Sequence, residues 1–328
     1  MPRTSAPVGA LLCLLALPWG LFSPMSWGQG YPARPIRIVV PYTPGTGIDI
    51  VARTVGPRFN QRWGQPVIVD NRPGASGNLG ADIVAKAQPD GYTLMVTANT
   101  FTITPALFRN LPYDPVNDFT AIGKIATGNL ALVVNAAALP VKALGELAAA
   151  ARAQPARLSY SSPGNGTPQH LAMELLKQRL AVDFLHVPHK GAAGALTDLL
   201  GGQVQLAVLP VHTALPHARA GRLNVIAVSG ESRSVLAPDS PSFAELGLKN
   251  LDIDLYFWLA GPAGVPRDVV LKLNQTLASA VSPPDVRDML LKQGIVPATG
   301  APQEISAQIR NDVARWKKFI GENRITAD

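Results

Sequence analysis

Cysteine is almost absent from this chain, because Cys13 is the only one among its 328 residues. Cys13 lies in an N-terminal stretch that we expect to be removed, so the mature protein would have none. This absence excludes disulfides, thiolate catalysis and cysteine-ligated metal sites. At this length, folding buries about three quarters of the unfolded chain's surface, which suffices for one large domain or two medium ones.

Concentrated positive charge is also lacking. The formal net charge is +7, but the basic residues are scattered, and the densest pair, Lys317 and Lys318, lies in a helical pattern where we expect a solvent-exposed face. Nucleic-acid-binding domains usually carry a concentrated basic stripe within a recognisable module. We therefore expect no nucleic-acid partner, while the mild positive field would help to attract anionic solutes.

Long apolar runs are missing beyond the N-terminus, and even there the run is shorter than the roughly 20 residues needed to span a bilayer. Arg3 is followed by the apolar stretch 8–22 and then by the small residues Ser26 and Gly28. This order is typical of a secretory signal peptide. The sequence therefore predicts a signal peptide over residues 1–28, cleavage near Gly28 and an exported protein.

Short β-branched runs alternate with helical stretches along most of the chain, and a strand–helix–strand–helix–strand order predicts a parallel sheet covered by helices. The first set has strands at 36–42, 67–70 and 92–99 and helices at 49–63 and 79–87. The second has strands at 130–135, 158–161, 184–187, 203–208, 223–228 and 251–259, helices at 141–153 and 168–180, and a helical tail at 268–281, 284–293 and 303–320.

This pattern predicts an α/β protein with two lobes. We expect residues 29–128 plus 255–328 to form the first lobe and residues 129–254 to form the second. The chain would then cross between the lobes twice, near 127–130 and near 251–256, and these crossovers would act as a hinge.

Three strand-to-helix turns are rich in glycine: Pro44–Asp49, Pro163–Pro168 and Lys190–Gly194. Glycine allows a sharp turn or a close approach to a ligand, and a helix N-terminus offers unpaired N–H groups and a positive dipole end to an anion. In parallel α/β sheets these turns lie at the carboxyl edge, where ligands bind. The predicted ligand-binding residues are Gly45, Thr46, Gly47, Asn99, Gly164, Asn165, Gly166, Thr167, His170, Lys190 and Gly191.

Thr167 is suited to cap the helix that follows it, with Pro168 at the first helical position. His170 then lies in the first turn, where the dipole favours a neutral, hydrogen-bonding imidazole. A fourth glycine-rich turn, 72–80, leaves two alternatives open for Ser76 and Asn78, which either reach the ligand or only cap a helix.

Several of these segments, in this order, resemble the Bug family, the TctC-like solute receptors of tripartite tricarboxylate transporters. The matching segments are Tyr31–Tyr42, Pro44–Arg53, Val69–Asn78, Gly164–Leu171, Pro188–Ala193 and Leu199–Val204. The resemblance implies a type II periplasmic binding fold, with two βαβ lobes closing on a small carboxylate that is delivered to the membrane subunits of the transporter.

The resemblance also implies how the carboxylate is held: by backbone amides of the first two loops, partly through ordered waters, and not by an arginine clamp. Those amides would belong to Gly45, Thr46 and Gly47 and to Asn165, Gly166 and Thr167. We further expect a monomer without a cofactor.

This chain departs from the family pattern at three places. The family commonly has glycine where Thr46 stands, a residue such as threonine where Ile48 stands, and an aspartate in the strand that here reads 205–210. The far end of the ligand is therefore expected to meet a more apolar wall. Aromatic acids, amino acids and dicarboxylates all stay open.

A nucleotide-dependent enzyme is the alternative, because Gly45-x-Gly47 follows a strand and Asp70 ends the next. The third glycine of that fingerprint is missing, which makes the match weak. No Gly-x-Ser-x-Gly nucleophile elbow occurs. His186 and His189 are three apart on an expected strand and so point to opposite faces. We therefore expect neither an enzyme nor a metal site.

Overall fold

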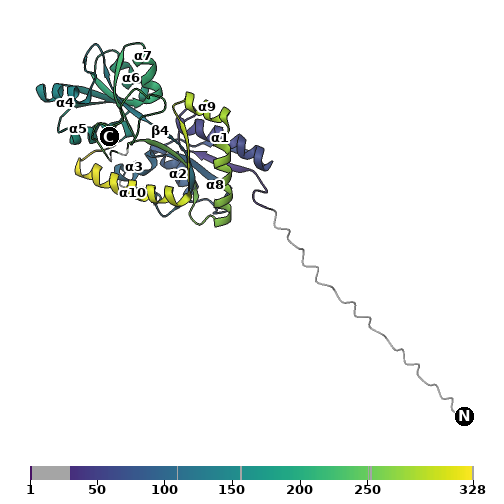
Figure 1. Cartoon of the computed structure of the whole chain (residues 1–328). Coiled ribbons are helices and arrows are strands. Elements are labelled where there is room, and N and C mark those ends of the chain that lie inside the picture. The colour runs from purple at the N-terminus through teal and green to yellow at the C-terminus, as the bar shows by residue number, and fades with distance from the viewer. Residues whose placement is uncertain (2–29, 109, 156, 250, 252, 327–328) are drawn as a thin grey trace. The chain divides into compact units, whose positions relative to one another are not determined.

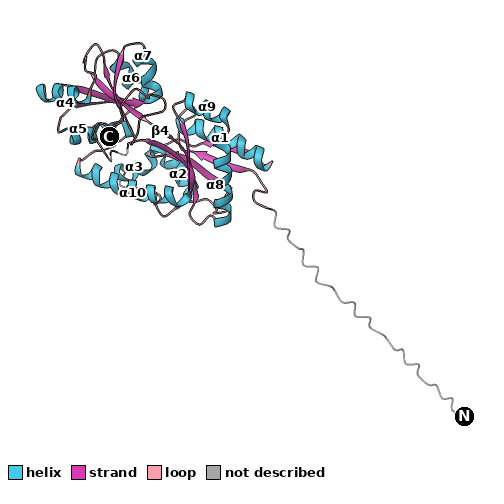
Figure 2. Cartoon of the chain, in the orientation of Figure 1, coloured by secondary structure: helices cyan, strands magenta, loops and turns pink. Residues whose placement is uncertain are grey.

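Two mixed β-sheets, each accompanied by its own helices, make up the fold (Figures 1 and 2). The computed structural model describes residues 1, 30–108, 110–155, 157–249, 251 and 253–326. The predicted signal peptide and its cleavage site therefore lie outside the described residues. From Pro32 onward the chain forms a single compact unit.

The first sheet has the strand order β11-β4-β10-β3-β1-β2. Its strands are β1 (Ile36–Val40), β2 (Val67–Asn71), β3 (Thr93–Ala98), β4 (Phe119–Gly128), β10 (Leu255–Pro262) and β11 (Val296–Gly300). Ile38 in β1 pairs with Val69 on one side and Leu94 on the other, both in parallel register. The carboxyl ends of these three strands therefore meet at one edge, as the sequence predicts.

The second sheet has the order β7-β6-β8-β5-β9. Its strands are β5 (Leu130–Asn135), β6 (Ser159–Ser162), β7 (Leu185–Pro188), β8 (Leu206–Pro210) and β9 (Leu223–Val228). Strand β6 runs parallel to β7 and β8.

The prediction of purely parallel sheets is wrong for the strands next to the crossovers. Strand β10 is antiparallel to both β3 and β4, and β5 is antiparallel to both β8 and β9. The reason is the connectivity: β5 and β10 each begin where the chain has just crossed between the sheets, at the edge where neighbouring strands end, as the pairs Leu130–Pro210 and Leu255–Gly128 show.

The helices of the first sheet are α1 (Gly47–Trp63), α2 (Asn78–Ala85), α3 (Thr100–Leu107), α8 (Arg267–Val281), α9 (Pro284–Lys292) and α10 (Pro302–Glu322), with a short 3-10 turn η1 (Ala75–Gly77). Those of the second are α4 (Leu144–Ala153), α5 (Pro168–Leu180), α6 (Ala192–Leu200) and α7 (Val211–Arg219). Figure 1 shows both groups around their sheets. None of the helices in the described part of the chain combines the length and apolar character that a membrane crossing requires.

Each sheet buries its own apolar cluster. Trp258 of β10 packs with Phe101 of α3 and with Ile305 and Ile309 of α10. In the second sheet, strands β5, β6 and β8 pack against α4 and α5. Helix α10 also reaches α5, because Trp316 packs in one cluster with residues of that helix, so the tail contacts helices of both sheets.

The two crossover segments are hydrogen-bonded to each other. Asn129 follows β4, and Asp254 precedes β10. The Asn129 side-chain amide donates to Asp254 Oδ1 at 3.1 Å, and the Ser229 hydroxyl bonds to the same oxygen. The Asn99 side-chain amide donates to the Asp254 carbonyl oxygen at 3.2 Å. Segments far apart in the sequence are thus joined where the chain passes between the sheets.

Candidate ligand-binding cavity

A cavity of about 490 Å³ lies where the glycine loops of the two sheets meet, and we call it the loop cavity. Residues that accompany the first sheet line one part of it: Tyr42, Gly45, Thr46, Gly47, Ile48, Ile50, Ala98, Asn99, Thr100, Gly128, Leu255, Phe257, Gln293, Gly294 and Ile295. Residues that accompany the second sheet line the rest: Asn129, Pro163, Thr167, Pro168, Gln169, Ala192, Pro210, His212 and Thr213.

The first loop turns sharply into α1. Gly45 has φ +84°, in the left-handed region that favours glycine. Thr46 caps the helix, and its hydroxyl accepts from the Asp49 N–H at 3.5 Å while donating to the Thr43 carbonyl at 3.0 Å. The Gly45 N–H donates to Asp49 Oδ2 at 2.9 Å. Hydrogen bonds within residues 43–49 thus fix the conformation of this loop.

Asp49 is a buried carboxylate that organises this turn. Besides Gly45, it accepts from Arg53 Nε at 3.0 Å and from the side-chain amide of Asn71 at 2.9 Å. Burial acts to raise the pKa of Asp49, but the hydrogen bonds from Gly45, Arg53 and Asn71 outweigh it and hold that pKa below its ordinary value. Asp49 is therefore ionised, and both of its carboxylate oxygens accept hydrogen bonds.

The second loop repeats this design with a different side chain. Thr167 caps α5, as the sequence predicts, and its hydroxyl accepts from the His170 N–H at 3.4 Å. Gly166 has φ +70°, and its N–H donates to His170 Nδ1 at 2.9 Å. His170 thus occupies in the second loop the position that Asp49 occupies in the first.

His170 is neutral, as the sequence predicts. Its Nδ1 accepts a hydrogen bond, so its proton lies on Nε2. The ring stacks on His186 with centroids 4.0 Å apart, and His186 Nε2 lies 2.7 Å from the Ser162 hydroxyl. Burial lowers the pKa of each histidine to about 4, with the Lys177 charge adding to the shift at His170 and the neighbouring His170 adding to it at His186.

The third loop is tied to the second through its backbone. Gly191 has φ +123°, and its N–H donates to the Pro163 carbonyl oxygen at 2.9 Å. Lys190 is exposed, while Ala192 at the start of α6 lines the loop cavity. His189 Nε2 lies 3.2 Å from Asp198 Oδ2, whereas His186 lies beside Ser162, so the two histidines have different neighbours, as their spacing indicates.

Unpaired backbone donors gather at the first loop. Within the described residues, the N–H groups of Thr46, Gly47 and Ile48 have no hydrogen-bond partner, and neither do those of Gln169 and Ala192. All five residues line the loop cavity. Three donors predicted from the sequence are instead taken: Gly45 N–H by Asp49, Gly166 N–H by His170 and Thr167 N–H by the Gly164 carbonyl oxygen. The free donors therefore lie nearer the first helical turns.

The predicted site residues divide into two groups. Gly45, Thr46, Gly47, Asn99 and Thr167 line the loop cavity, whereas Gly164, Asn165, Gly166, His170, Lys190 and Gly191 do not. In the second group, Gly166 and His170 are hydrogen-bonded to each other, and Gly191 donates to Pro163, which lines the cavity. Of the two side chains left open in the fourth turn, Asn78 is buried and accepts from the Tyr113 hydroxyl at 2.7 Å, and Ser76 is exposed.

Sequence reasoning predicted a more apolar wall at Ile48 and the strand 205–210, and Ile48 and Pro210 do line the loop cavity, but it missed Phe257 and Ile295. Phe257 of β10 and Ile295 before β11 both lie beside the first loop, where a Cβ on Gly47 would meet the Phe257 ring at 3.4 Å and Ile295 Cδ1 at 3.9 Å. His212 of α7 and Gly294 meet across the sheets in the same way. The sequence around these residues carries no signal that they adjoin a ligand site.

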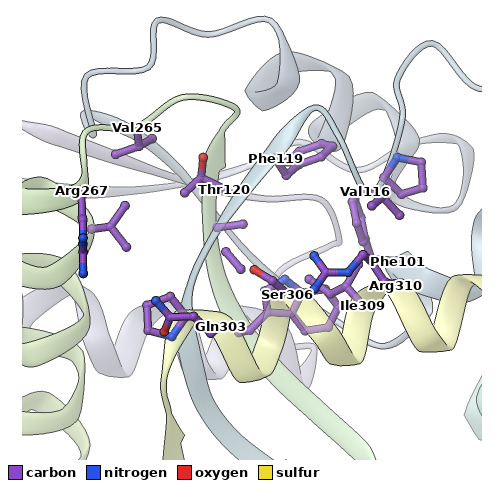
Figure 3. A pocket seen from close by; sticks show the side chains of 16 residues that line it. Phe101, Val116, Phe119, Thr120, Val265, Arg267, Gln303, Ser306, Ile309 and Arg310 are labelled. Carbon is purple, nitrogen blue, oxygen red and sulfur yellow. The ribbon is translucent and has the colours of Figure 1, made fainter.

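A second cavity of about 500 Å³ lies under the N-terminal half of α10 (Figure 3). Phe101, Phe119 and Trp258 contribute to its apolar lining, and Arg267 and Arg310 line it as well. None of the glycine loops contributes to its lining. The loop cavity, where helix N-termini converge, is the stronger candidate site.

Known proteins share this sequence and architecture. The family model described as the tripartite tricarboxylate transporter family receptor matches residues 51–325. The Bordetella pertussis protein BugT is 30% identical over 324 residues, covering 98% of this chain and 98% of BugT. This chain belongs to that receptor family.

Solved structures of other proteins confirm the predicted type II periplasmic binding fold. R. palustris Rpa4515, solved with adipate, is 33% identical and superposes with a TM-score of 0.76, covering 90% of the receptor described here and 99% of Rpa4515. The periplasmic binding protein BugD is 29% identical with a TM-score of 0.73, covering 90% and 99% of the two chains.

Proposed function

We propose that this receptor captures a small carboxylate in the loop cavity and delivers it to the membrane subunits of a tripartite tricarboxylate-type transporter. The observation that carries the proposal is the set of unpaired N–H groups of Thr46, Gly47 and Ile48 on the cavity wall. They lie at the N-terminus of a 17-residue helix, where the partial positive charge of the dipole favours an anion.

A carboxylate bound in this way needs no cationic side chain. Hydrogen bonds to a charged group each contribute about 1.5–3 kcal/mol, so two or three amides give substantial affinity. The Gln169 and Ala192 amides approach from the second sheet, so one anion would contact helices of both sheets. The adipate complex of Rpa4515 supports a carboxylate ligand.

Capture would proceed by closure of two lobes, residues 29–128 plus 255–328 and residues 129–254. The distribution of strands between the two sheets supports this division. Asn129 and Asp254 mark the hinge, because they lie at the two crossovers and are bonded to each other. Hinge closure around a ligand is a common route to burying it.

Export with removal of residues 1–28, a monomeric state and the absence of catalysis or cofactor complete the proposal. Family membership supports the periplasmic location. The N-terminal glycines that favoured a nucleotide site are engaged differently, since Gly45 is held by Asp49.

The proposal can be tested by removing one amide proton. Gly47 is the first residue of α1, a position that proline tolerates, and Thr46 before it is already extended at φ −73° and ψ 159°. Gly47→Pro therefore deletes a single donor with the helix start intact. Gly47→Ala is the matched variant, because it adds a Cβ and keeps the N–H.

Calorimetric titration with small carboxylates should show Gly47→Pro binding roughly tenfold or more weakly than Gly47→Ala, as expected for a lost charge-assisted bond. Equal affinities in the two variants would remove the Gly47 amide from the site. No binding of any carboxylate by the unaltered protein would overturn the proposed function.

A further inference from the structure

We propose that the cavity under the N-terminal half of α10, which we call the α10 cavity, is a second ligand site that takes an aromatic acid. The α10 cavity and the loop cavity share no lining residue, so the inference stands apart from the proposed function. A volume of about 500 Å³ falls within the range of small-molecule pockets.

The two cavities lie on different sides of strand β10. Phe257 lines the loop cavity beside Gly47, whereas Trp258, the next residue, lines the α10 cavity and packs with Ile305 of α10. Consecutive residues of a strand point to opposite faces of the sheet. A molecule in the α10 cavity would therefore leave the loop cavity open to its own ligand.

Two arginines give the α10 cavity a positive lining. Arg267 is the first residue of α8, and Arg310 shares one face of α10 with Gln303 and Ser306, which are seven and four residues before it (Figure 3). Neither arginine has an ion-pair partner among the residues that the structure describes. A guanidinium group without a partner is well suited to bind a carboxylate through two parallel hydrogen bonds.

No carboxylate within the described part of the chain lines this cavity. Asp268 and Glu304 each follow a lining residue in the sequence, but both stand outside the lining. The Glu304 carboxylate instead accepts from the Ala301 N–H at 3.3 Å. Helices α8 and α10 both begin at the cavity, and the positive ends of their dipoles add to the attraction for an anion.

The rest of the lining favours a flat apolar ring. Phe101 packs edge-to-face against Phe119, with ring centroids 5.0 Å apart, and against Trp258, with centroids 5.9 Å apart. Aromatic rings prefer such edge-to-face or offset contacts, so a further ring in the cavity extends this cluster. The aliphatic part of the lining includes Val265, Val270 and Ile309.

The indole N–H of Trp258 is a buried donor without an acceptor. The side chain is fully buried, and Nε1 has no hydrogen-bond partner among the described residues. A buried indole N–H usually finds a partner. Because Trp258 lines the α10 cavity, an oxygen of a bound acid can supply the missing acceptor. An inorganic anion would leave the aromatic wall unused, and an apolar molecule would leave the arginines and this donor unused.

The charge requirement can be tested with 2-naphthoate and 2-naphthamide, which share one ring system and differ in charge. Calorimetric titration at neutral pH should show 2-naphthoate binding about tenfold or more tightly, as expected for charge-assisted bonds to arginine. The double variant Arg267→Gln/Arg310→Gln should lose this preference. Arg287→Gln is the matched control, because Arg287 is exposed and lies outside both linings.

The location can be tested through the indole N–H signal of Trp258 in ¹H–¹⁵N NMR spectra, assigned by its disappearance in Trp258→Phe. This signal should move as 2-naphthoate is added, and Gly47→Pro, which alters only the loop cavity, should leave the 2-naphthoate affinity unchanged. Movement of the signal together with loss of affinity in the arginine variant would support the second site.

Three results would overturn the inference. They are no binding of 2-naphthoate, binding that is unaffected by the arginine variant and weakened by Gly47→Pro, and binding that leaves the Trp258 indole signal in place. In each case the proposed function would stand or fall separately, because the titration of the Gly47 variants with small carboxylates tests it.

Discussion

Leu107, at the end of α3, packs directly over Gly166 in the second loop. A Cβ on Gly166 would lie only 2.2 Å from Leu107 Cδ1, and Gly166 also has φ +70°. Helix α3 accompanies the first sheet and the Gly166 loop accompanies the second, so this contact joins the two sides of the loop cavity. Glycine at 166 is required here by packing as well as by backbone conformation.

Replacing Gly166 should therefore weaken ligand binding by keeping the two sides apart. We expect Gly166→Val to lower carboxylate affinity by about tenfold or more, because a clash and a strained φ act together. Adding Leu107→Ala should restore part of the affinity by removing the clash. Calorimetry on both variants checks this, and undiminished affinity in Gly166→Val would contradict it.

His170 should govern the order of the second loop through its acceptor nitrogen. His170→Phe keeps a ring but leaves the buried Gly166 N–H unpaired, which costs about 1–3 kcal/mol. His170→Asn still presents an acceptor near the place of Nδ1. Hydrogen exchange should show the Gly166 amide losing protection in the phenylalanine variant and keeping more of it in the asparagine variant. Equal protection in the two variants would argue against this role.

Acidification should destabilise the protein already at pH values above those at which most carboxylates titrate. The pKa of His170 is lowered to about 4, below the ordinary value of about 6.5. Between these two pH values His170 is therefore protonated in the unfolded state and neutral in the folded state. The contribution of His170 to the free energy of unfolding is fully present above about pH 6.5. It is lost as the pH falls toward 4, by a total on the order of 3 kcal/mol. The lowered pKa of Asp49 acts only below about pH 4.

Urea unfolding across this pH range measures the effect. His170→Phe should flatten the slope of the unfolding free energy between about pH 6.5 and pH 4, with His186 and His212, whose pKa values burial also lowers, accounting for the part that stays. An unchanged slope in the variant would show that His170 does not contribute to it.

The two threonine caps should stabilise their helices to a similar extent. Thr46→Ala and Thr167→Ala each remove a side-chain acceptor at a helix N-terminus, which typically costs about 1 kcal/mol. Thr→Ser at either position keeps the hydroxyl and serves as the control. Equilibrium unfolding in urea provides the comparison, and alanine variants as stable as the serine variants would rule out a capping role.

The parts of the fold that were predicted from sequence are those with local signals. The apolar spacing in α1 and the Thr167-Pro168 start of α5 mark helices without reference to the rest of the chain. Strand β4 was missed, although it is the longest strand of the first sheet, because its alternation is interrupted by Gly123 and Lys124. Its antiparallel pairing with β10 joins segments far apart in the sequence, which no local pattern reveals.

For the site, too, the features that were predicted are those with local sequence signals. The glycine loops were identified because positive φ and helix starts have sequence signatures. That the Gly45 and Gly166 amides are occupied depends on the side chains at Asp49 and His170 turning back onto the loop. The apolar wall of Phe257 and Ile295 depends on how distant strands meet, so it became visible only in three dimensions.

The most direct test of the account is an amide titration by ¹H–¹⁵N NMR spectroscopy, with hexanoate added to the isotope-labelled protein. We predict that the amide signals of Gly47 and Ile48 shift downfield as they bind the carboxylate, whereas the Gly166 amide, already bonded to His170, moves little. Saturable binding that leaves the Gly47 and Ile48 signals in place would contradict the central claim that backbone amides at the start of α1 hold the ligand.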